Sequence, residues 1–250
     1  MNQTELNVII PAYNEEDRIY HTLEYTVKQL SSFTSSFHIY CVNDGSEDHT
    51  GDEIQRFASQ SSCVTRIDND GNQGKGYALR HGVISCGPSE YIAFLDADLD
   101  IDPIQLKKYL EIMKGTGCDV VIGSKMHKDS EVDYPTRRRI LSYGYYFIVR
   151  ILFHLHVHDT QTGIKLFRYE CIKKVMPKIL VKRFAYDIEV LALCHHYHYK
   201  ITEAPVKIVF QRQNKWGKIR FNDVYRTAND TLAVFYRLNI LHYYDRSDIS

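Results

Sequence analysis

The sequence predicts an α/β fold with a mainly parallel sheet flanked by helices. Short runs rich in Val, Ile and Tyr alternate with stretches of helical length through the first half of the chain. Polar, turn-forming residues follow the apolar runs, and the chain of 250 residues is 44% hydrophobic, which is ample for a core. Because this alternation is typical of βαβ units, we expect the strands to pair mainly in parallel.

The expected elements of the first half follow the alternation in order. Apolar runs predict strands over 6–10, 37–42, 64–67, 91–95 and 119–122. The stretches between them predict helices over 15–30, 48–60, 74–85 and 103–114, the last with Pro103 in its first turn. Ligands of such sheets bind beyond the carboxyl ends of the strands, so the polar residues collected at that edge predict a binding site.

The second half of the chain is less regular. Long apolar and aromatic stretches predict helices over 140–157, 184–196 and 221–239, and 204–211 predicts a strand. At helical spacing, the last of these helices places seven apolar side chains on one face: Phe221, Val224, Tyr225, Ala228, Leu232, Phe235 and Tyr236.

Composition excludes several classes of protein. Lys and Arg total 31, as do Asp and Glu, and the formal net charge of zero predicts no nucleic-acid partner. The six cysteines form no CxxC pair, which indicates reduced thiols in a cytosolic setting. The sequence has no signal-peptide pattern and no uncharged apolar run of 18 residues, so we expect neither secretion nor a spanning helix.

Four acids at alternate positions follow the fourth expected strand: Asp96, Asp98, Asp100 and Asp102. An EF-hand is excluded, because a loop that starts at Asp96 would hold Ile and Lys where glycine and glutamate are required. Two interpretations stay open. Either the acids end a solvated strand and cap the next helix, or they hold Mg²⁺ or Mn²⁺ through few carboxylates and leave positions for phosphate oxygens.

Eight motifs together carry a resemblance to a known family. The first four are VIIPAYNEE (8–16), VNDGS (42–46), NQGKGYALRHG (72–82) and DADLD (96–100). The other four are VIGSKMH (121–127), RRRILSYG (137–144), DTQTGIKLF (159–167) and FAYDIEVL (184–191). Over residues 6–215 the sequence resembles family 2 glycosyltransferases of the GT-A fold. Within them it is most similar to the polyprenyl-phosphate group and its dolichyl-phosphate glucosyltransferase branch.

The resemblance implies an inverting glycosyltransferase that moves a hexose onto a polyprenyl phosphate. UDP-glucose is the favoured donor, a GDP-sugar is the second, and Mg²⁺ or Mn²⁺ is the implied cofactor. One GT-A domain over 1–250 is expected, with a nucleotide-sugar-binding half (1–125) and an acceptor half with interfacial helices (126–250).

Donor and metal residues carry over from the matching motifs. Asp98 is the first implied metal ligand and Asp100 the second, while Asp96 would contact the sugar or ribose. The other implied donor contacts are Pro11, Ala12, Tyr13, Glu15, Asp44, Lys75, Ala97 and Arg212, with Lys215 as a further candidate.

A phosphate acceptor needs cations rather than a general base, because its oxygen is already anionic at neutral pH. The implied acceptor-phosphate contacts are Lys125, Arg137, Arg138 and Ser142, with Arg138 four residues before Ser142 as in the family. Lys125 stands where relatives often carry Arg, so it offers a single ammonium charge instead of a guanidinium that can bind a phosphate through two N–H groups.

Asp98, Arg138 and Asp159 are the implied catalytic residues. Asp159 would orient the sugar or tune the nucleophile. Asp187 and Glu189 either contact the ligands or only hold the structure, and the sequence leaves both options open.

Two other functions stay open at this point. One is transfer to a hydroxyl of a cell-surface saccharide, of capsule or teichoic-acid type, which would make a general base essential and the arginines dispensable. The other is a non-catalytic protein that retains the fold.

The aromatic stretch over 140–157 follows three arginines and predicts an interfacial helix, although a helix packed on the sheet is the alternative. We therefore expect a peripheral enzyme at the cytoplasmic face of the membrane, with or without a membrane-protein partner. A metal site among the histidines at 154, 156, 158, 195, 196 and 198 is a weaker possibility.

Overall fold

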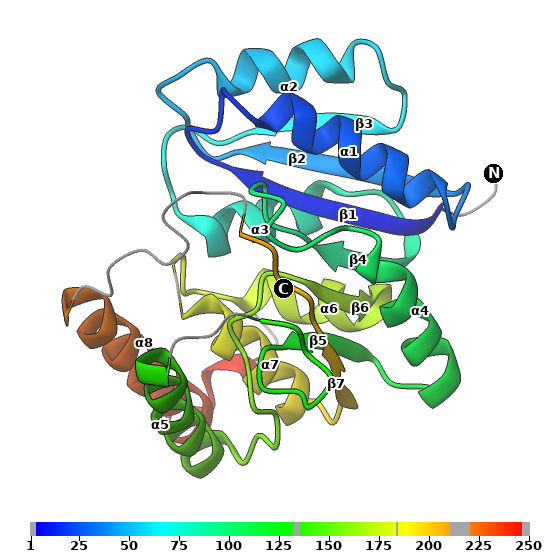
Figure 1. The fold of residues 1–250 in the computed structure, drawn as a ribbon. Helices are drawn as coiled ribbons and strands as arrows, with labels where there is room; N and C mark the ends of the chain where they lie inside the picture. The colour runs from blue at the N-terminus through cyan, green and yellow to red at the C-terminus, as the bar shows by residue number, and fades with distance from the viewer. Residues whose placement is uncertain (1–3, 133–135, 184, 211–220, 247–250) are drawn as a thin grey trace.

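The computed structural model describes residues 4–132, 136–183, 185–210 and 221–246. This part of the chain forms a seven-stranded sheet in the order β3-β2-β1-β4-β6-β5-β7 (Figure 1). Only β6 runs antiparallel to its neighbours, β4 and β5. The strands are β1 (Thr4–Ala12), β2 (Phe37–Asn43), β3 (Val64–Asp68), β4 (Ser89–Phe94), β5 (Val120–Ser124), β6 (Lys165–Arg168) and β7 (Ile201–Pro205).

Helices cover both faces of the sheet because alternate strand residues point to opposite sides. Val8 and Ile10 pack with α1 (Ile19–Ser31), α2 (Thr50–Ala58) and α4 (Gln105–Thr116). Ile9 packs on the other face, whose core is shared by α3 (Lys75–Ser85), α5 (Thr136–Phe153), α6 (Tyr169–Val175), α7 (Tyr186–His196) and α8 (Phe221–Asn239). Two short 3-10 helices cover Met176–Lys178 and Tyr243–Asp245.

The predicted mainly parallel sheet flanked by helices is confirmed, with corrections at particular elements. The first helix begins at Ile19 instead of residue 15. The reason is that the Glu15 and Glu16 amides donate to Thr50 Oγ1 (2.7 Å) and Asp48 Oδ2 (3.2 Å), so a turn precedes the helix. The last strand covers Ile201–Pro205 and not 204–211, since its pairing with β5 ends at Pro205.

The α8 helix turns much of its predicted apolar stripe outward. Tyr225, Leu232 and Tyr236 are exposed, whereas the helix buries Val234 and Leu238 on a neighbouring face. The side chains of Phe221 and Val224 lie outside the described ones. The stripe at 225, 232 and 236 is therefore not the face that holds α8 to the core.

The α5 helix has a similar exposed face and lies beside α8 (Figure 1). Tyr145 and Thr231 hydrogen-bond through their hydroxyls at 3.0 Å, and the rings of Phe153 and Phe235 meet edge to face. We use the name α5/α8 surface for the exposed apolar side chains of the two helices, 46% to 70% exposed: Tyr143, Phe147, Ile148, Ile151, Tyr225, Leu232 and Tyr236. Among the described helices, none combines the length and the apolar character that crossing a membrane requires.

Candidate active site

A pocket of about 350 Å³ opens at the carboxyl ends of β1, β2 and β4. This is the edge where the strand order predicts a ligand. The start of α3 and the segment before α7 complete its wall. The lining residues are Pro11, Ala12, Tyr13, Glu15, Asp44, Asn72, Gly74, Lys75, Asp96, Ala97, Asp98 and Arg183. Every predicted donor residue except Arg212 therefore lines one pocket, while Arg212 and Lys215 lie outside the described residues.

Asp44 holds the glycine-rich loop in front of α3. The buried carboxylate accepts from the amides of Gln73 (3.1 Å) and Gly74 (2.8 Å), and from Asn69 Nδ2 (2.7 Å). Gly74 has a φ of +99°, in the region that favours glycine. Asp44 thus positions the start of α3, a structural task that the sequence alone does not reveal.

Lys75 and Asp96 form an ion pair across the pocket floor. Burial acts to lower the pKa of the Lys75 ammonium, but the carboxylates of Asp96 and Asp187 outweigh it and raise this pKa. Burial likewise acts to raise the pKa of Asp96, and Lys75 more than offsets it, so the pKa of Asp96 is lowered. Both groups are therefore charged at neutral pH, and Lys75 is largely neutralised by its partner.

Asp98 is in the opposite situation. Burial first, and then the charges of Asp96 and Asp100, raise the pKa of Asp98 to about 6. Its Oδ1 accepts from the Asp100 amide at 3.1 Å, and Leu99 between them has a φ of +58°. A non-glycine residue in that region marks a constrained turn. The turn keeps two carboxylates close together, which costs energy unless a cation joins them.

The acids after β4 fit a divalent ion of the Mg²⁺ type. Within the described residues, no group of three or more His, Cys, Asp or Glu side chains is arranged to hold a metal ion. The described histidines therefore form no such group. The same finding is compatible with an ion that takes one or two carboxylates and completes its shell with phosphate oxygens and water.

The remaining acid of the run, Asp102, has a structural role. Its Oδ1 accepts from the Ile104 amide at 3.0 Å, just before α4, and its Oδ2 accepts from the Tyr25 hydroxyl at 2.9 Å. Asp102 therefore stabilises the turn that leads into α4, whose N-cap residue is Ile104. Asp96 and Asp98 line the pocket, whereas the predicted second metal ligand, Asp100, is adjacent in sequence but not among the lining residues.

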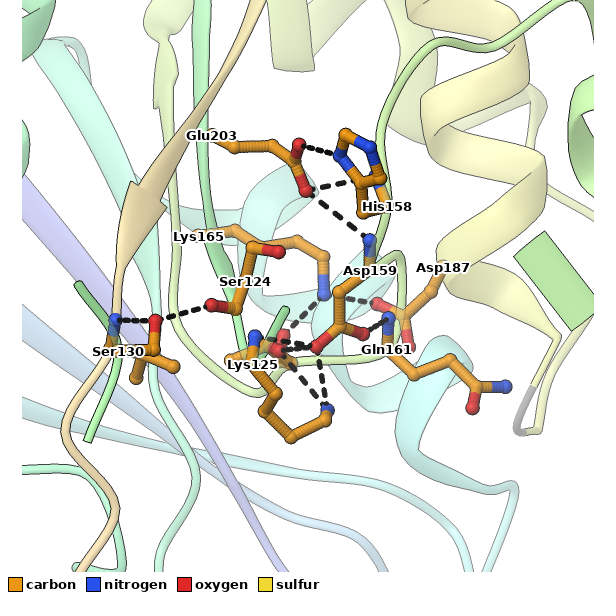
Figure 2. A network of polar contacts seen from close by, with 11 residues as sticks. Ser124, Lys125, Ser130, His158, Asp159, Gln161, Lys165, Asp187 and Glu203 are labelled. Carbon is orange, nitrogen blue, oxygen red and sulfur yellow. Dashed lines mark hydrogen bonds and ion pairs between the residues drawn. The ribbon is translucent and has the colours of Figure 1, made fainter. Parts of the chain in front are cut away.

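A second group of charged residues lies where the DTQTG segment meets the ends of β5 and β7 (Figure 2). Asp159 Oδ2 accepts from the Lys125 amide (3.0 Å) and the Thr162 hydroxyl (2.6 Å), and it pairs with Lys125 Nζ (2.9 Å). Asp159 Oδ1 accepts from the Gln161 amide at 3.0 Å. Burial acts to raise the pKa of Asp159, but Lys125 and Thr162 more than compensate and lower it. Asp159 is thus an ionised carboxylate with both oxygens engaged.

Lys165 and Asp187 make a buried ion pair in the same cluster. Lys165 Nζ lies 2.6 Å from Asp187 Oδ1 and also donates to the Thr162 carbonyl at 2.5 Å. The two residues are only 2% and 6% exposed. A buried charge without a partner is costly, so this pair fixes the start of α7 against β6. We call Lys125, Asp159, Lys165 and Asp187 the paired cluster.

Gly163 joins the paired cluster to the pocket. A Cβ atom at this position would lie 2.1 Å from Asp96 Oδ2, closer than any real contact allows. A larger residue here would therefore displace the Asp96 carboxylate or the DTQTG segment. This contact could not be predicted from the sequence, because Gly163 and Asp96 are far apart along the chain.

Glu189 is fully buried and serves as an anchor. Its Oε2 accepts from the amides of Leu180 (2.9 Å) and Val181 (2.7 Å), and its Oε1 accepts from the Tyr244 hydroxyl and lies 3.3 Å from Arg237 Nη2. Burial raises the pKa of Glu189. These contacts favour a structural role over direct contact with a ligand.

The predicted arginines of the acceptor site fall at the start of α5. Arg137 and Arg138 belong to this helix, but their side chains lie outside the described ones. Ser142 follows one turn later and is partly exposed. Their contact with an acceptor stays a prediction.

Several known proteins are similar to this chain. The glycosyl transferase family 2 profile matches residues 7–176. A dolichyl-phosphate beta-glucosyltransferase of Trichomonas vaginalis is 30% identical over 253 residues, which cover 96% of this chain and 76% of the relative. The human dolichyl-phosphate beta-glucosyltransferase is 32% identical over 218 residues, 81% of this chain and 66% of the relative. Glycosyltransferase AglD of Haloferax volcanii is 25% identical over 238 residues, 94% of this chain and 38% of the relative.

Solved structures show the same fold. Glucosyl-3-phosphoglycerate synthase from Mycobacterium tuberculosis, in complex with UDP, matches with a TM-score of 0.66 at 14% identity, over 93% of this chain and 79% of that chain. The same enzyme in complex with Mn²⁺, UDP and glucosyl-3-phosphoglycerate matches with a TM-score of 0.65. The predicted GT-A fold is thereby confirmed. Since the family profile spans most of the chain, this protein belongs to glycosyl transferase family 2 and is a glycosyltransferase.

Proposed function

We propose that this glycosyltransferase transfers a hexose, with inversion, from a UDP-sugar to a polyprenyl phosphate, and that the sugar is glucose. The acceptor assignment depends on the hydrogen bonding and ionisation of Asp159. Both of its oxygens are occupied by hydrogen-bond donors, and its pKa is lowered, so it is poorly suited to remove a proton from a hydroxyl. A phosphate acceptor requires no such base.

The donor would occupy the pocket at the strand ends. Tyr13, which is 39% exposed, would offer a ring for the base, and Asp96, which lines the same pocket, would accept a hydrogen bond from a sugar hydroxyl. Mycobacterial glucosyl-3-phosphoglycerate synthase binds UDP and Mn²⁺ on this fold, which supports a UDP-sugar over a GDP-sugar. The dolichyl-phosphate beta-glucosyltransferases among the relatives support glucose and a lipid phosphate.

Asp98 and Asp100 would hold Mg²⁺ or Mn²⁺. A bound divalent ion neutralises the nucleoside diphosphate as it leaves, which lowers the barrier to cleavage of the sugar–phosphate bond. Burial first, and then the neighbouring charges of Asp96 and Asp100, raise the pKa of Asp98, and a bound cation would offset both effects by stabilising its ionised form.

The reaction needs no covalent enzyme intermediate. An oxygen of the acceptor phosphate forms a bond to the anomeric carbon while the bond from that carbon to the UDP oxygen breaks. Lys125, Arg137, Arg138 and Ser142 would bind the acceptor phosphate. Asp159 would act as a positioning residue, because it holds both the backbone and the ammonium group of Lys125.

We further propose that the α5/α8 surface rests on the membrane that contains the lipid acceptor, at its cytoplasmic face. Its tyrosines, phenylalanine and aliphatic side chains are exposed on two adjacent helices, which is the composition of interfacial helices. Arg150 and Arg226 are exposed on the same two helices and would meet anionic headgroups. The alternative is that a membrane protein binds this surface.

One assay tests donor and acceptor together. Purified protein is incubated with a short polyprenyl phosphate, Mg²⁺ or Mn²⁺, and each of several UDP- and GDP-sugars, and the lipids are analysed by mass spectrometry. A glucosyl phospholipid from UDP-glucose is the expected product. Release of UDP with a saccharide product and no lipid product would instead establish a hydroxyl acceptor, as in capsule or teichoic-acid assembly.

A further inference from the structure

Arg183 brings an unneutralised cation to the donor pocket. It lines the same pocket as Asp96 and Asp98, and its side chain is exposed. No carboxylate in the described part of the chain forms an ion pair with its guanidinium. Lys75, the other cation of the pocket, is bound to Asp96. Among the described residues that line the pocket, Arg183 is therefore the cation without a carboxylate partner.

The segment that carries Arg183 is anchored on two sides. Glu189 accepts from the amides of Leu180 and Val181, and the carbonyl of Lys182 accepts from the Gly76 amide at 2.9 Å. These contacts fasten the residues just before Arg183 to α7 and to the start of α3. An arginine on such a segment is held in place before any ligand arrives, which reduces the entropy cost of binding.

The glycines of the loop before α3 make room for this segment. A Cβ at Gly74 would lie 2.6 Å from the Lys182 carbonyl oxygen and 2.9 Å from Arg183 Cγ. A Cβ at Gly76 would lie 2.7 Å from the Val181 carbonyl oxygen. The glycine-rich stretch therefore does more than turn the chain: it lets the base of the Arg183 side chain pack directly on the pocket wall.

We propose that Arg183 binds the diphosphate of the nucleotide-sugar donor and stabilises the nucleoside diphosphate as it leaves. This inference rests on the proposed function. A guanidinium matches phosphate oxygens in a two-pronged, charge-assisted geometry. Its positive charge would add to that of a divalent ion in neutralising the diphosphate. Because Arg183 lines the same pocket as the predicted nucleoside contacts, we assign it to the donor and not to the acceptor phosphate.

Lys182 provides a matched control. It is adjacent in sequence, exposed and equally charged, but it does not line the pocket. Its ammonium group donates to Gln73 Oε1 at 3.0 Å and lies 5.3 Å from the centre of the Tyr77 ring. Removing it changes the local charge by the same amount without touching the proposed contact.

The test is calorimetric titration of UDP, UMP and uridine, with Mn²⁺ present, into the wild type, Arg183→Ala, Arg183→Lys and Lys182→Ala. Loss of a charge-assisted contact predicts a UDP affinity roughly 10- to 100-fold weaker in Arg183→Ala, with a smaller loss in Arg183→Lys. Uridine affinity stays unchanged in all variants, which also reports an intact pocket. Lys182→Ala binds all three ligands like the wild type.

Other outcomes separate this inference from the proposed function. A wild type that binds neither UDP nor a UDP-sugar would overturn the donor assignment and the inference with it. A wild type that binds UDP while Arg183→Ala binds it equally well would overturn only the inference. An unchanged UDP affinity with a raised KM for the polyprenyl phosphate would move Arg183 to the acceptor and also contradict the proposal.

Discussion

The pocket after β4 and the paired cluster beside it differ in whether their charged side chains have partners of opposite charge. In the paired cluster each lysine has its own carboxylate, Lys125 with Asp159 and Lys165 with Asp187. In the pocket Lys75 pairs with Asp96, and Asp98 is left with a raised pKa beside other acids. The two regions touch at Gly163, so one segment of chain separates compensated from uncompensated charge.

This difference indicates which region awaits a ligand. Charges that are already paired mainly hold elements in place, and Lys125 is the member of the cluster that we also propose as a contact of the acceptor phosphate. Crowded acids pay a cost in the free protein that a bound cation relieves, and functional sites are where such costs accumulate. The pocket is thus suited to the metal and diphosphate, and the paired cluster to positioning.

The largest expected effect is on turnover, in Asp98→Asn. Loss of the implied metal ligand removes stabilisation of the leaving diphosphate, and we expect turnover to fall on the order of 1,000-fold. Initial rates of sugar transfer at saturating metal measure this. Asp52→Asn, an exposed acid on α2, serves as the control and keeps wild-type rates. An Asp98→Asn enzyme with full activity would remove the metal assignment.

Substitution in the paired cluster is expected to lower the free energy of unfolding. Asp187→Asn leaves the Lys165 ammonium buried without its carboxylate, which costs about 3 kcal/mol of unfolding free energy. Urea denaturation followed by circular dichroism measures the loss. The double variant Lys165→Met with Asp187→Asn is more stable than the single one, because no unpaired charge remains. Equal stability of the single and double variants would show that the pair is not the stabilising unit.

The variant Gly163→Ala tests the contact between the paired cluster and the pocket. The added methyl group displaces the Asp96 carboxylate and disturbs its pair with Lys75, so we expect the transfer rate to fall about 10-fold. Gly115→Ala, where a Cβ meets nothing within 4 Å, is the matched control. Steady-state kinetics with UDP-glucose give the comparison. If both variants behave like the wild type, Gly163 does not set the position of Asp96.

Asp98 also predicts a pH effect on stability without metal. Its folded pKa of about 6 lies above the ordinary value of 3.8, so the fold binds the proton more tightly than the unfolded chain does. The Asp98 carboxyl therefore makes the wild type lose stability as pH rises from about 4 through 6, and Asp98→Asn lacks this contribution. Above pH 6 we expect Asp98→Asn to be more stable by about 1 kcal/mol, measured by denaturation in EDTA. A variant less stable than the wild type at pH 7.5 would contradict the crowding of charge.

The smallest effect is expected at the α5/α8 surface and only on the acceptor side. Ile148→Ser removes an apolar contact with the membrane and should raise the KM for lipid-embedded acceptor several-fold, leaving the KM for UDP-glucose unchanged. Ile84→Ser is the control, since Ile84 is 48% exposed and Ile148 is 50% exposed, but Ile84 lies on α3. If both substitutions change the KM for the lipid acceptor equally, the α5/α8 surface is not the part of the protein that contacts the membrane.

The sequence predicted the framework of the pocket well, because consecutive strands end at one edge and their polar residues follow directly. It missed β6, a four-residue antiparallel strand that sits between β4 and β5 and has no alternation long enough to show. It also missed α6, which follows directly on that strand.

Contacts between distant segments could not be predicted either, because they leave no local pattern in the sequence. Lys165 and Asp187 are separated by the whole of α6, and Gly163 meets Asp96 only through the fold. One signal was present: a lysine flanked by Ile164 and Leu166 in an apolar run implies a buried cation that needs an acid. Arg183 in a Lys-Arg pair looks like ordinary solvated surface until the segment is placed at the pocket.

The most direct test of the central claim compares two acceptors that differ only in the phosphate. Radiolabelled UDP-glucose is supplied with either a polyprenyl phosphate or the matching polyprenol, in the same vesicles with Mn²⁺, and lipid-bound label is counted. We predict glucosylation of the phosphate and no product above background from the alcohol, because the paired Asp159 offers no base to activate a hydroxyl. Equal rates with the two lipids, or transfer only to the alcohol, would contradict the assignment of a phosphate nucleophile.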